Sequence, residues 1–283
     1  MKPANYVLPI LILAFSFSYA NAQETTNGPE QKDTSKKYHY VFSVGKNGVK
    51  YETPNSQKRS KNKTRFETHW VMMDLGFNLL TDNTNYNSPA AGTFLHVPDN
   101  AKNSDLLGLR RGKSINVNIY PLMLRFAALK TKRQSIYIST GLGLQLYNFR
   151  YNEPVVFTKS PNSFITTNDT LHFRKDKLAF DYLNVPLMLT FKTKLGGLNK
   201  WLVYGVGITG GYRISSWTKQ TSSELGKVKT YDQFNFQNFN SCLTGEIGID
   251  DGIRFYVSYQ LTSLYQNTID QHPISFGIRF LGI

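Results

Sequence analysis

The 283-residue sequence contains a single cysteine, Cys242, so no disulfide can form within the chain. Beyond Phe17 it contains no long apolar run, whereas a membrane-spanning helix needs about 20 consecutive apolar residues. These two absences exclude a disulfide-stabilised domain and a protein that crosses a membrane with helices. A protein that crosses with strands is not excluded, because β-barrel strands carry a much weaker hydropathy signal.

The first residues have the features of an export signal. Lys2 provides a positive start, Val7–Phe17 is a short apolar run, and Ala20-Asn21-Ala22 is an A-x-A cleavage site. The run is too short for a membrane anchor. We therefore predict a secretory signal peptide over residues 1–22 and a mature protein that starts at Gln23.

Acidic residues are scarce: 19 Asp and Glu stand against 33 Lys and Arg, a net charge of +14. Such an excess often indicates a nucleic-acid partner. An exported chain meets other anions first, namely lipid headgroups and lipopolysaccharide phosphates. We therefore expect partners among outer-membrane lipid, lipopolysaccharide and other envelope proteins, and no nucleic acid.

Residues 23–65 are polar and contain a basic cluster, made of Lys58, Arg59, Lys61, Lys63 and Arg65. This composition predicts a flexible, disordered N-terminal segment. The alternative is a polybasic segment that lies near the headgroups of the inner leaflet, because it directly precedes the first predicted strand.

From Phe66 onward, apolar and polar residues alternate with the period of two that is typical of strands. In the last segment Ile274, Phe276, Ile278 and Phe280 share one face, and Arg279 lies on the other. The same sorting recurs eight times, near residues 71–78, 114–119, 136–147, 182–191, 202–214, 242–249, 253–261 and 274–280.

The connections between these strands alternate in length. Those near 80–113, 148–176 and 219–233 are long, and those near 130–134, 194–199 and 250–252 are short. Bacterial transmembrane barrels have short periplasmic turns and long outer loops. One strand face is apolar, and the other is rich in Gly, Ser, Asn, Tyr and Arg, which cannot form the apolar interior of a soluble barrel. The apolar face must therefore face lipid.

Motifs for catalysis or cofactor binding are weak. Gly205–Gly210 matches G-x-G-x-x-G, but a dinucleotide site needs that run to open a helix, and here it lies inside an alternating strand. The five histidines show no metal-ligand spacing, and there is no G-x-S-x-G motif. We predict no enzymatic activity, no cofactor and no metal site.

One set of charged residues falls on the polar faces of the strands: Asp74, Arg213, Glu246, Arg254 and Arg279. Hairpin pairing around Asp251 places Glu246 near Arg254, while Asp74 and Arg279 belong to the strands that close the barrel. Buried charges must be paired. We predict an ion-pair network that fills the interior structurally; the alternative is a path for protons or ions.

Several of these runs resemble the outer-membrane β-barrel family of Bacteroidota, which includes PorT-like proteins. The runs are Trp70–Asn78, Gly112–Asn118, Thr140–Leu144 and Tyr182–Leu187. The resemblance implies an outer-membrane barrel, and PorT-like members take part in the assembly of a secretion system. It supplies no catalytic residues. The chain ends Phe280-Leu281-Gly282-Ile283, whereas such barrels often end in an aromatic residue.

The sequence as a whole predicts an all-β protein: an eight-stranded antiparallel transmembrane up-and-down barrel over residues 66–283, in the bacterial outer membrane. Its expected role is structural or interactive, and the resemblance to PorT-like proteins implies an association with secretion or assembly. One alternative is a narrow pore or transport component, and a second is a soluble exported ligand-binding barrel.

Overall fold

The computed structural model describes residues 41–45, 48–52, 65–167, 173–196, 200–223, 226–250 and 252–281. The predicted signal peptide, residues 1–22, lies outside the described residues, and so does most of the segment 23–65. Within that segment the structure describes a two-stranded antiparallel hairpin, β1 (Val41–Gly45) and β2 (Gly48–Glu52), which the sequence analysis did not predict.

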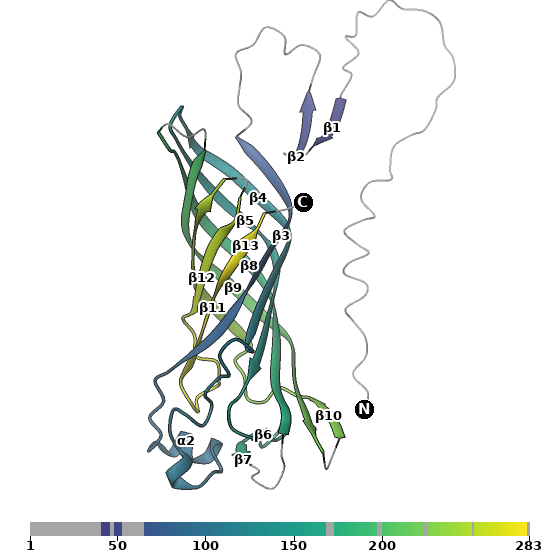
Figure 1. Cartoon of the computed structure of the whole chain (residues 1–283), viewed down its shortest axis with the longest axis vertical. Helices are drawn as coiled ribbons and strands as arrows, with labels where there is room; N and C mark the ends of the chain where they lie inside the picture. Colours follow the sequence, from purple (N-terminus) through teal and green to yellow (C-terminus); the bar gives the residue numbers. More distant parts are fainter. Residues whose placement is uncertain are drawn as a thin grey trace, which may run out of the picture. The chain divides into compact units, whose positions relative to one another are not determined.

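The remaining elements are almost all strands (Figure 1). In chain order they are β3 (Phe66–Asp82), α2 (Pro89–Phe94), the 3-10 turn η3 (Asp99–Ala101), β4 (Ile115–Lys130), β5 (Gln134–Arg150), β6 (Val155–Phe157), β7 (Ile165–Thr167), β8 (Phe173–Lys194), β9 (Trp201–Ser222), β10 (Gly226–Tyr231), β11 (Phe239–Ile249), β12 (Arg254–Gln260) and β13 (Gln271–Phe280). No helix among the described residues is long and apolar enough to cross a membrane.

Eight of these strands form a closed antiparallel ring. The hydrogen-bonded order is β9-β11-β12-β13-β3-β4-β5-β8, and β8 pairs again with β9. The first strand of the ring, β3, therefore pairs with the last, β13. A closed ring leaves no sheet edge with unpaired backbone groups, as a strand-built membrane span requires. The predicted eight-stranded antiparallel barrel is confirmed.

The predicted orientation of the two strand faces is also confirmed. Leu187 is 51% exposed and Ile208 is 52% exposed, although both lie in the middle of long, fully paired strands. Their neighbours on the other face, such as Met188 and Thr209, are buried. We call the exposed apolar surface the apolar band; it includes Leu75, Phe77, Ile138, Leu142, Val185, Leu187, Val206, Ile208, Leu243, Ile247, Val257 and Phe276. An exposed belt of this size is incompatible with water and suits lipid.

A proline inside the wall lies where the pairing is irregular. Between Ile119 and Leu122 the register of β4 against β5 shifts, and Pro121 lies in that shift. Proline has no backbone N–H to donate to the ladder, so within sheets it is confined to edges and bulges. The register shift therefore falls where β4 has one backbone donor fewer.

The short turns lie where the sequence analysis placed them, between β4 and β5, β8 and β9, and β11 and β12. The long connections differ from the prediction in two ways. First, there are four and not three, because residues 261–270 between β12 and β13 also form one. Second, β8 starts at Phe173 and β9 runs to Ser222, so parts of the predicted loops 148–176 and 219–233 are strand. In addition, β10 pairs with the end of β9.

Candidate functional site

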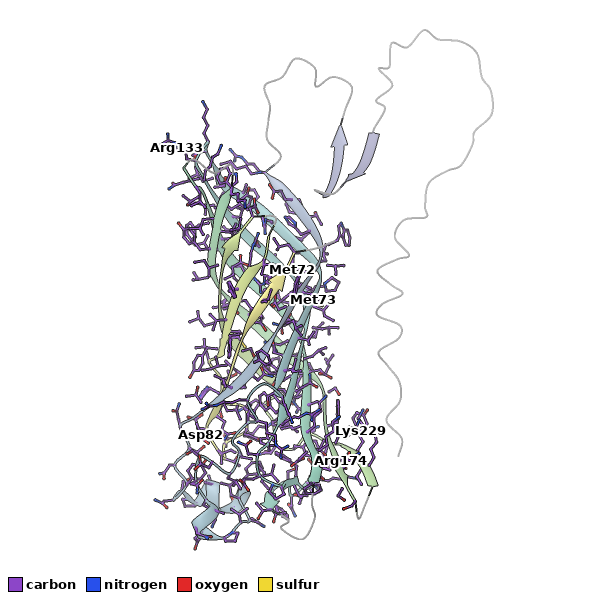
Figure 2. All side chains as sticks on the ribbon, viewed as in Figure 1. Met72, Met73, Asp82, Arg133, Arg174 and Lys229 are labelled. Carbon is purple, nitrogen blue, oxygen red and sulfur yellow. The ribbon has the colours of Figure 1, made fainter. Side chains whose placement is uncertain are left out.

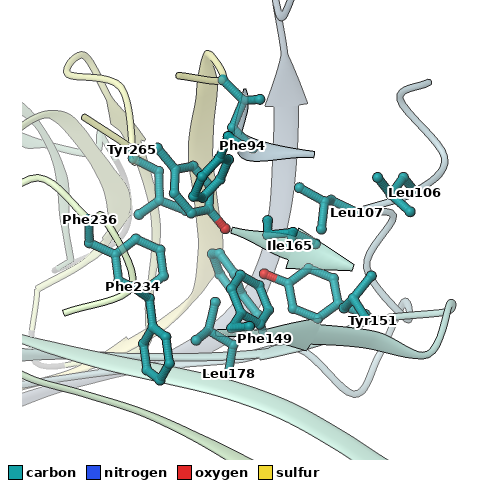
Figure 3. Close-up of a cluster of buried hydrophobic side chains, with 14 of the residues drawn as sticks. Phe94, Leu106, Leu107, Phe149, Tyr151, Ile165, Leu178, Phe234, Phe236 and Tyr265 are labelled. Carbon is teal, nitrogen blue, oxygen red and sulfur yellow. The ribbon is translucent and has the colours of Figure 1, made fainter. Parts of the chain in front are cut away.

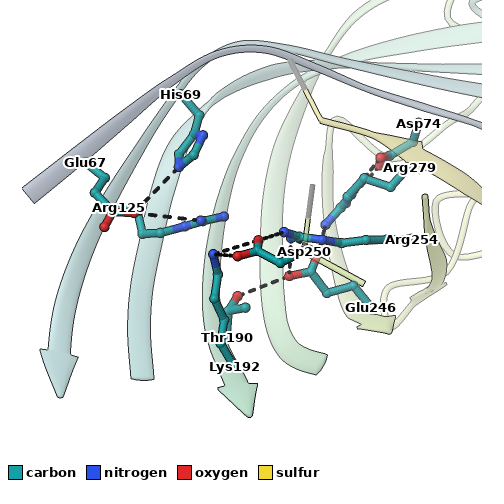
Figure 4. Close-up of polar contacts among 10 residues, drawn as sticks. All are labelled: Glu67, His69, Asp74, Arg125, Thr190, Lys192, Glu246, Asp250, Arg254 and Arg279. Atoms are coloured by element: carbon teal, nitrogen blue, oxygen red, sulfur yellow. Dashed lines mark hydrogen bonds and ion pairs between the residues drawn. The ribbon is translucent and has the colours of Figure 1, made fainter. Parts of the chain in front are cut away.

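The interior of the barrel contains a set of buried charges near the short-turn end (Figure 4). At the seam between β3 and β13, Asp74 and Arg279 are direct cross-strand partners. Arg279 donates from Nε to Asp74 Oδ1 at 2.7 Å and from Nη2 to Asp74 Oδ2 at 2.9 Å. This two-point geometry is the strongest form of the arginine–carboxylate pair. Both side chains are almost completely buried.

Glu246 on β11 links this pair to a second arginine. Its Oε2 accepts from Arg279 Nη1 at 2.8 Å, and its carboxylate lies 3.4 Å from Arg254 Nη1. The hairpin register places Glu246 opposite Tyr256 and Arg254 opposite Gly248, so the two charged residues are diagonal neighbours on the inner face. Thr190 donates from its hydroxyl to Glu246 Oε1 at 3.1 Å.

Four of the five predicted residues thus form one connected set with two charges of each sign. We call Asp74, Glu246, Arg254 and Arg279 the charged layer. It continues toward the short turns, where Arg254 approaches Asp250 at 3.5 Å and Lys192 Nζ contacts Asp250 at 2.7 Å. Because every charge in the layer has a partner of opposite sign, the layer can persist inside the barrel.

Arg213 was predicted in the same set, and its placement there is wrong. Its guanidinium bonds to Ser216 Oγ at 2.8 Å, to Asn238 Oδ1 at 2.7 Å and to the carbonyls of Phe236 and Gln237. Parity along β9 gave the correct inward face. It could not give the height of Arg213 in the barrel, which lies toward the long loops.

A further acid, Glu67, begins a second polar group at the short-turn end, which the sequence analysis missed. It accepts from Lys130 Nζ at 2.6 Å, and Arg125 Nη1 lies at 4.0 Å. Arg125 also lies over the ring of Tyr137, with its guanidinium carbon 5.3 Å from the ring centre. Glu67 and Arg125 are direct cross-strand partners on β3 and β4. Extending the alternating pattern of both strands toward the short turns would have indicated this pair.

Little space remains beside the charged layer. The cavity lined by Met72, Arg125, Met188, Glu246 and Arg279, among others, has a volume of about 20 Å³. That is room for about one water molecule. Toward the long loops, Asn118 donates to its cross-strand partner Asp74 at 3.1 Å, and Tyr256 of β12 donates to Asn116 of β4 at 2.9 Å.

The long loops close the opposite end of the barrel with an apolar core (Figure 3). We call this core the loop cap. It consists of Ala91, Phe94, Leu95, Val97, Leu106, Leu107, Tyr147, Phe149, Tyr151, Val155, Phe157, Ile165, Leu178, Phe180, Tyr182, Phe234, Phe236, Leu264, Tyr265 and Ile269. All four long connections contribute side chains to it.

Ring contacts join these loops to one another. Phe94 of the first loop packs on Tyr265 of the fourth at 5.2 Å between ring centres, and Phe236 of the third packs on Tyr265 at 4.9 Å. Phe157 of the second packs on Phe234 of the third at 5.8 Å. The sequence predicts polar loops for these stretches, because their aromatic residues are spaced irregularly and show no strand period.

Among the described residues, no group of three His, Cys, Asp or Glu side chains is placed to hold a metal ion. No family model matches this chain, and no curated protein matches it. Among solved structures, the chain is similar to Ail, the attachment invasion locus protein of Yersinia pestis, with 9% identity and a TM-score of 0.25. The match covers 75% of this chain and 98% of that chain. The closed strand order and the apolar band establish the barrel.

Proposed function

We propose that this chain is an outer-membrane β-barrel with a structural or interaction role, and that it is not a solute channel. The main support for the absence of a channel is that side chains fill the interior of the barrel. An eight-stranded barrel has a lumen only wide enough for its own side chains. Here the charged layer leaves a cavity of about 20 Å³, and the loop cap covers the other end.

Two sequence features support the outer membrane as the location. The predicted signal peptide directs export, and an exported strand-built span has its place in the outer membrane of a bacterium. The apolar band argues against the alternative of a soluble ligand-binding barrel, because its exposed leucines and isoleucines have nothing to pack against in water.

The outer surface of the loop cap offers a place for a partner. A hollow of about 730 Å³ lies between the end of α2, residues 160–164 and the loops around Asn235 and Gln266. At its edge His96 stacks on Phe164, with ring centres 4.2 Å apart. A polar hollow with a stacked aromatic pair suits a contact with another envelope protein.

The resemblance to PorT-like proteins supplies a narrower hypothesis, a part in the assembly of a secretion system. Capture of neighbours from the native membrane tests it. The full chain would carry a cross-linkable residue at Asn162, in the hollow, with a matched residue at Lys132, in the short-turn end, as control. Partners that cross-link at Asn162 alone support an interaction role of the loop cap.

Conductance tests the channel alternative. In a planar bilayer the folded chain should give no resolved open steps. Steps that disappear when Gly141 or Gly207, both on the inner face, is replaced by a bulky residue would overturn the proposal. Cell fractionation tests the location: recovery in the soluble periplasm without detergent would contradict an outer-membrane protein.

A further inference from the structure

The chemistry of the two strand faces inverts along β5 and β8, where the inward residues beyond the band include Phe149 and Phe180. Within the apolar band the outward residues are apolar, such as Leu183 and Leu187, and the inward residues are polar, such as Asn184. Beyond the band, toward the loop cap, Lys177 points outward while Leu178 and Phe180 are completely buried. The strands therefore leave the lipid and continue as a water-facing sheet over an apolar core.

The register of this sheet places four cations side by side. Arg150 on β5 pairs with Lys177 on β8, Lys177 pairs with Lys219 on β9, and Lys219 pairs with Lys229 on β10. Cross-strand partners lie on the same face, about 4.5–5.5 Å apart at Cβ, and like charges placed so are destabilising. We call these four residues the cation row. Figure 2 shows Lys229 at the cap end of the barrel, opposite Arg133.

Neighbouring rows strengthen this pattern. Toward the strand ends, Lys175 and Lys227 flank Thr221 on the same face. Toward the lipid, Trp217 and Tyr231 are direct partners. The ammonium groups of Lys177 and Lys229 lie 4.7 Å and 4.1 Å from the centre of the Trp217 ring. These cation–π contacts hold the lysines in place.

The cations have little compensation within the part of the chain that the structure describes. No carboxylate there lies within 4.0 Å of the charged nitrogens of Arg150, Lys175, Lys177, Lys219, Lys227 or Lys229. Asp181, nearer the lipid, is the acid on this face of β8. Burial, followed by repulsion from Lys175, Arg150 and Lys219, lowers the pKa of Lys177 to about 8. Repulsion, chiefly from Lys227, also lowers the pKa of Lys219.

The sheet that carries the cation row is held from behind. On its inner face Leu178 and Phe180 belong to the loop cap, and Gln220 donates to the carbonyl of Val155 at 3.0 Å. The charges on β8 and β9 are therefore fixed on a packed support, and Lys229 of β10 is held by its contact with Trp217, so a ligand has less to order.

We propose that the cation row binds the phosphate groups of anionic lipid headgroups at the membrane surface. This inference deepens the proposed function, because it rests on the barrel being in a membrane. The order along one continuous face is apolar band, then Trp217 and Tyr231, then cations. Aromatic residues mark the membrane–water interface, and lysines and arginines just outside it contact anionic headgroups.

The experiment uses the full chain, folded in neutral detergent, and a fluorescent acylated glucosamine disaccharide that carries two phosphates. The same lipid after removal of both phosphates, and the phosphorylated disaccharide without acyl chains, are the comparison ligands. The test variant is Lys177→Gln, Lys219→Gln and Lys229→Gln together. The matched control, Lys113→Gln, Lys132→Gln and Lys159→Gln, removes the same charge from exposed positions outside the row.

The unaltered chain should bind the phosphorylated lipid, and binding should weaken as salt rises. The test variant should bind about 100-fold more weakly, because each basic residue near an anionic surface contributes about a fivefold factor in affinity. The control should bind like the unaltered chain. Equal binding of the dephosphorylated lipid, or unchanged binding by the test variant, would overturn the proposal. Equally tight binding of the deacylated disaccharide would assign the row to a soluble phosphate and overturn the lipid site.

Folding is measured separately by gel electrophoresis, as the change in electrophoretic mobility of the protein when the sample is heated. If the triple variant fails to fold, Lys219→Gln alone should still weaken binding about fivefold, and no change would overturn the proposal. A chain that fractionates with the outer membrane but does not prefer the phosphorylated lipid would refute only this inference. Recovery of the chain in the soluble periplasm would refute the proposed function.

Discussion

Asp74 and Arg279 are 205 positions apart in the sequence and form a two-point ion pair across the closing seam of the barrel. They are direct partners in the register of β3 and β13, and Gly76 pairs with Gly277 two positions along. The glycines leave room for the large side chains on either side. A Cβ on Gly76 would clash with the backbone carbonyl oxygen of Phe276 and come within 2.5 Å of the Tyr256 hydroxyl. The seam therefore combines a buried charge pair with a close backbone contact.

Removal of one partner of this pair should destabilise the barrel strongly. We expect Asp74→Asn or Arg279→Met to cost about 3–5 kcal/mol each, because each change leaves an uncompensated buried charge. The double variant should cost much less than the sum. Urea unfolding in lipid vesicles measures the double-mutant cycle. An interaction energy near zero would mean that the two side chains do not meet.

A positive charge on the apolar band should be costly at its centre and cheap at its edge. We expect Leu187→Arg to cost about 2–4 kcal/mol, and Leu129→Arg, beside a short turn, to cost about 0–1 kcal/mol. Refolding yields and unfolding free energies in vesicles compare the two. If both variants fold equally well, the position of the membrane along the strands is wrong.

Two glycines of β9 should respond differently to one added methyl group. A Cβ on Gly207 would clash with the carbonyl oxygen of Leu187 and lie within 2.8 Å of the Met188 Cα. A Cβ on Gly210 would meet no atom within 4 Å. We expect Gly207→Ala to lower the folded yield or cost about 1–3 kcal/mol, and Gly210→Ala to be near neutral. Equal effects would contradict the close packing of β8 against β9.

Asp176, beyond the apolar band at the cap end, should make stability depend on pH. Its burial raises the pKa of the carboxyl from 3.8 to about 7. Below pH 3.8 the group is neutral in both states. Between that value and about 7 the unfolded chain loses the proton while the folded chain keeps it, so stability falls as pH rises, and above about 7 the loss is complete.

The variant Asp176→Asn removes this dependence. It keeps an oxygen that accepts from Gln220, and it should be more stable than the unaltered chain at pH 8 and nearly equal at pH 4. Each pH unit of the window corresponds to at most about 1.4 kcal/mol. Urea unfolding at several pH values measures the difference, and parallel curves would show that the carboxyl titrates normally.

The strand faces were predictable because the lipid imposes one rule on every strand. Outward residues such as Leu187 and Ile208 must be apolar, and charged residues such as Asp74 and Glu246 must face inward. The period of two in the sequence therefore assigns each residue to one face. Closure of the ring then brings Asp74 to Arg279 without further information. This is why four of the five charged positions could be placed together.

Where the rule changes, the prediction fails. Near Lys177 and Phe180 the outside is polar and the inside apolar, so the alternation continues with opposite chemistry, and the sequence pattern predicts the strand only from about residue 182. Arg213 lies close to that boundary, and its height depends on loops that follow no period. The loop cap could not be predicted either. Its residues Phe94, Phe236 and Tyr265 come from three different loops that follow no period, and they meet only after the chain has folded.

The shared core of the loop cap constrains how this protein can change over time. In many barrels a surface loop can lengthen, shorten or be replaced without effect on its neighbours. Here Tyr265 of the shortest of the four long connections packs on rings from two other loops, so a deletion in one connection exposes apolar surface in the rest. Variation should therefore concentrate in side chains on the outer surface of the loop cap. Insertions should be tolerated between the end of β9 and the start of β10, because neither strand contributes a described residue to that core.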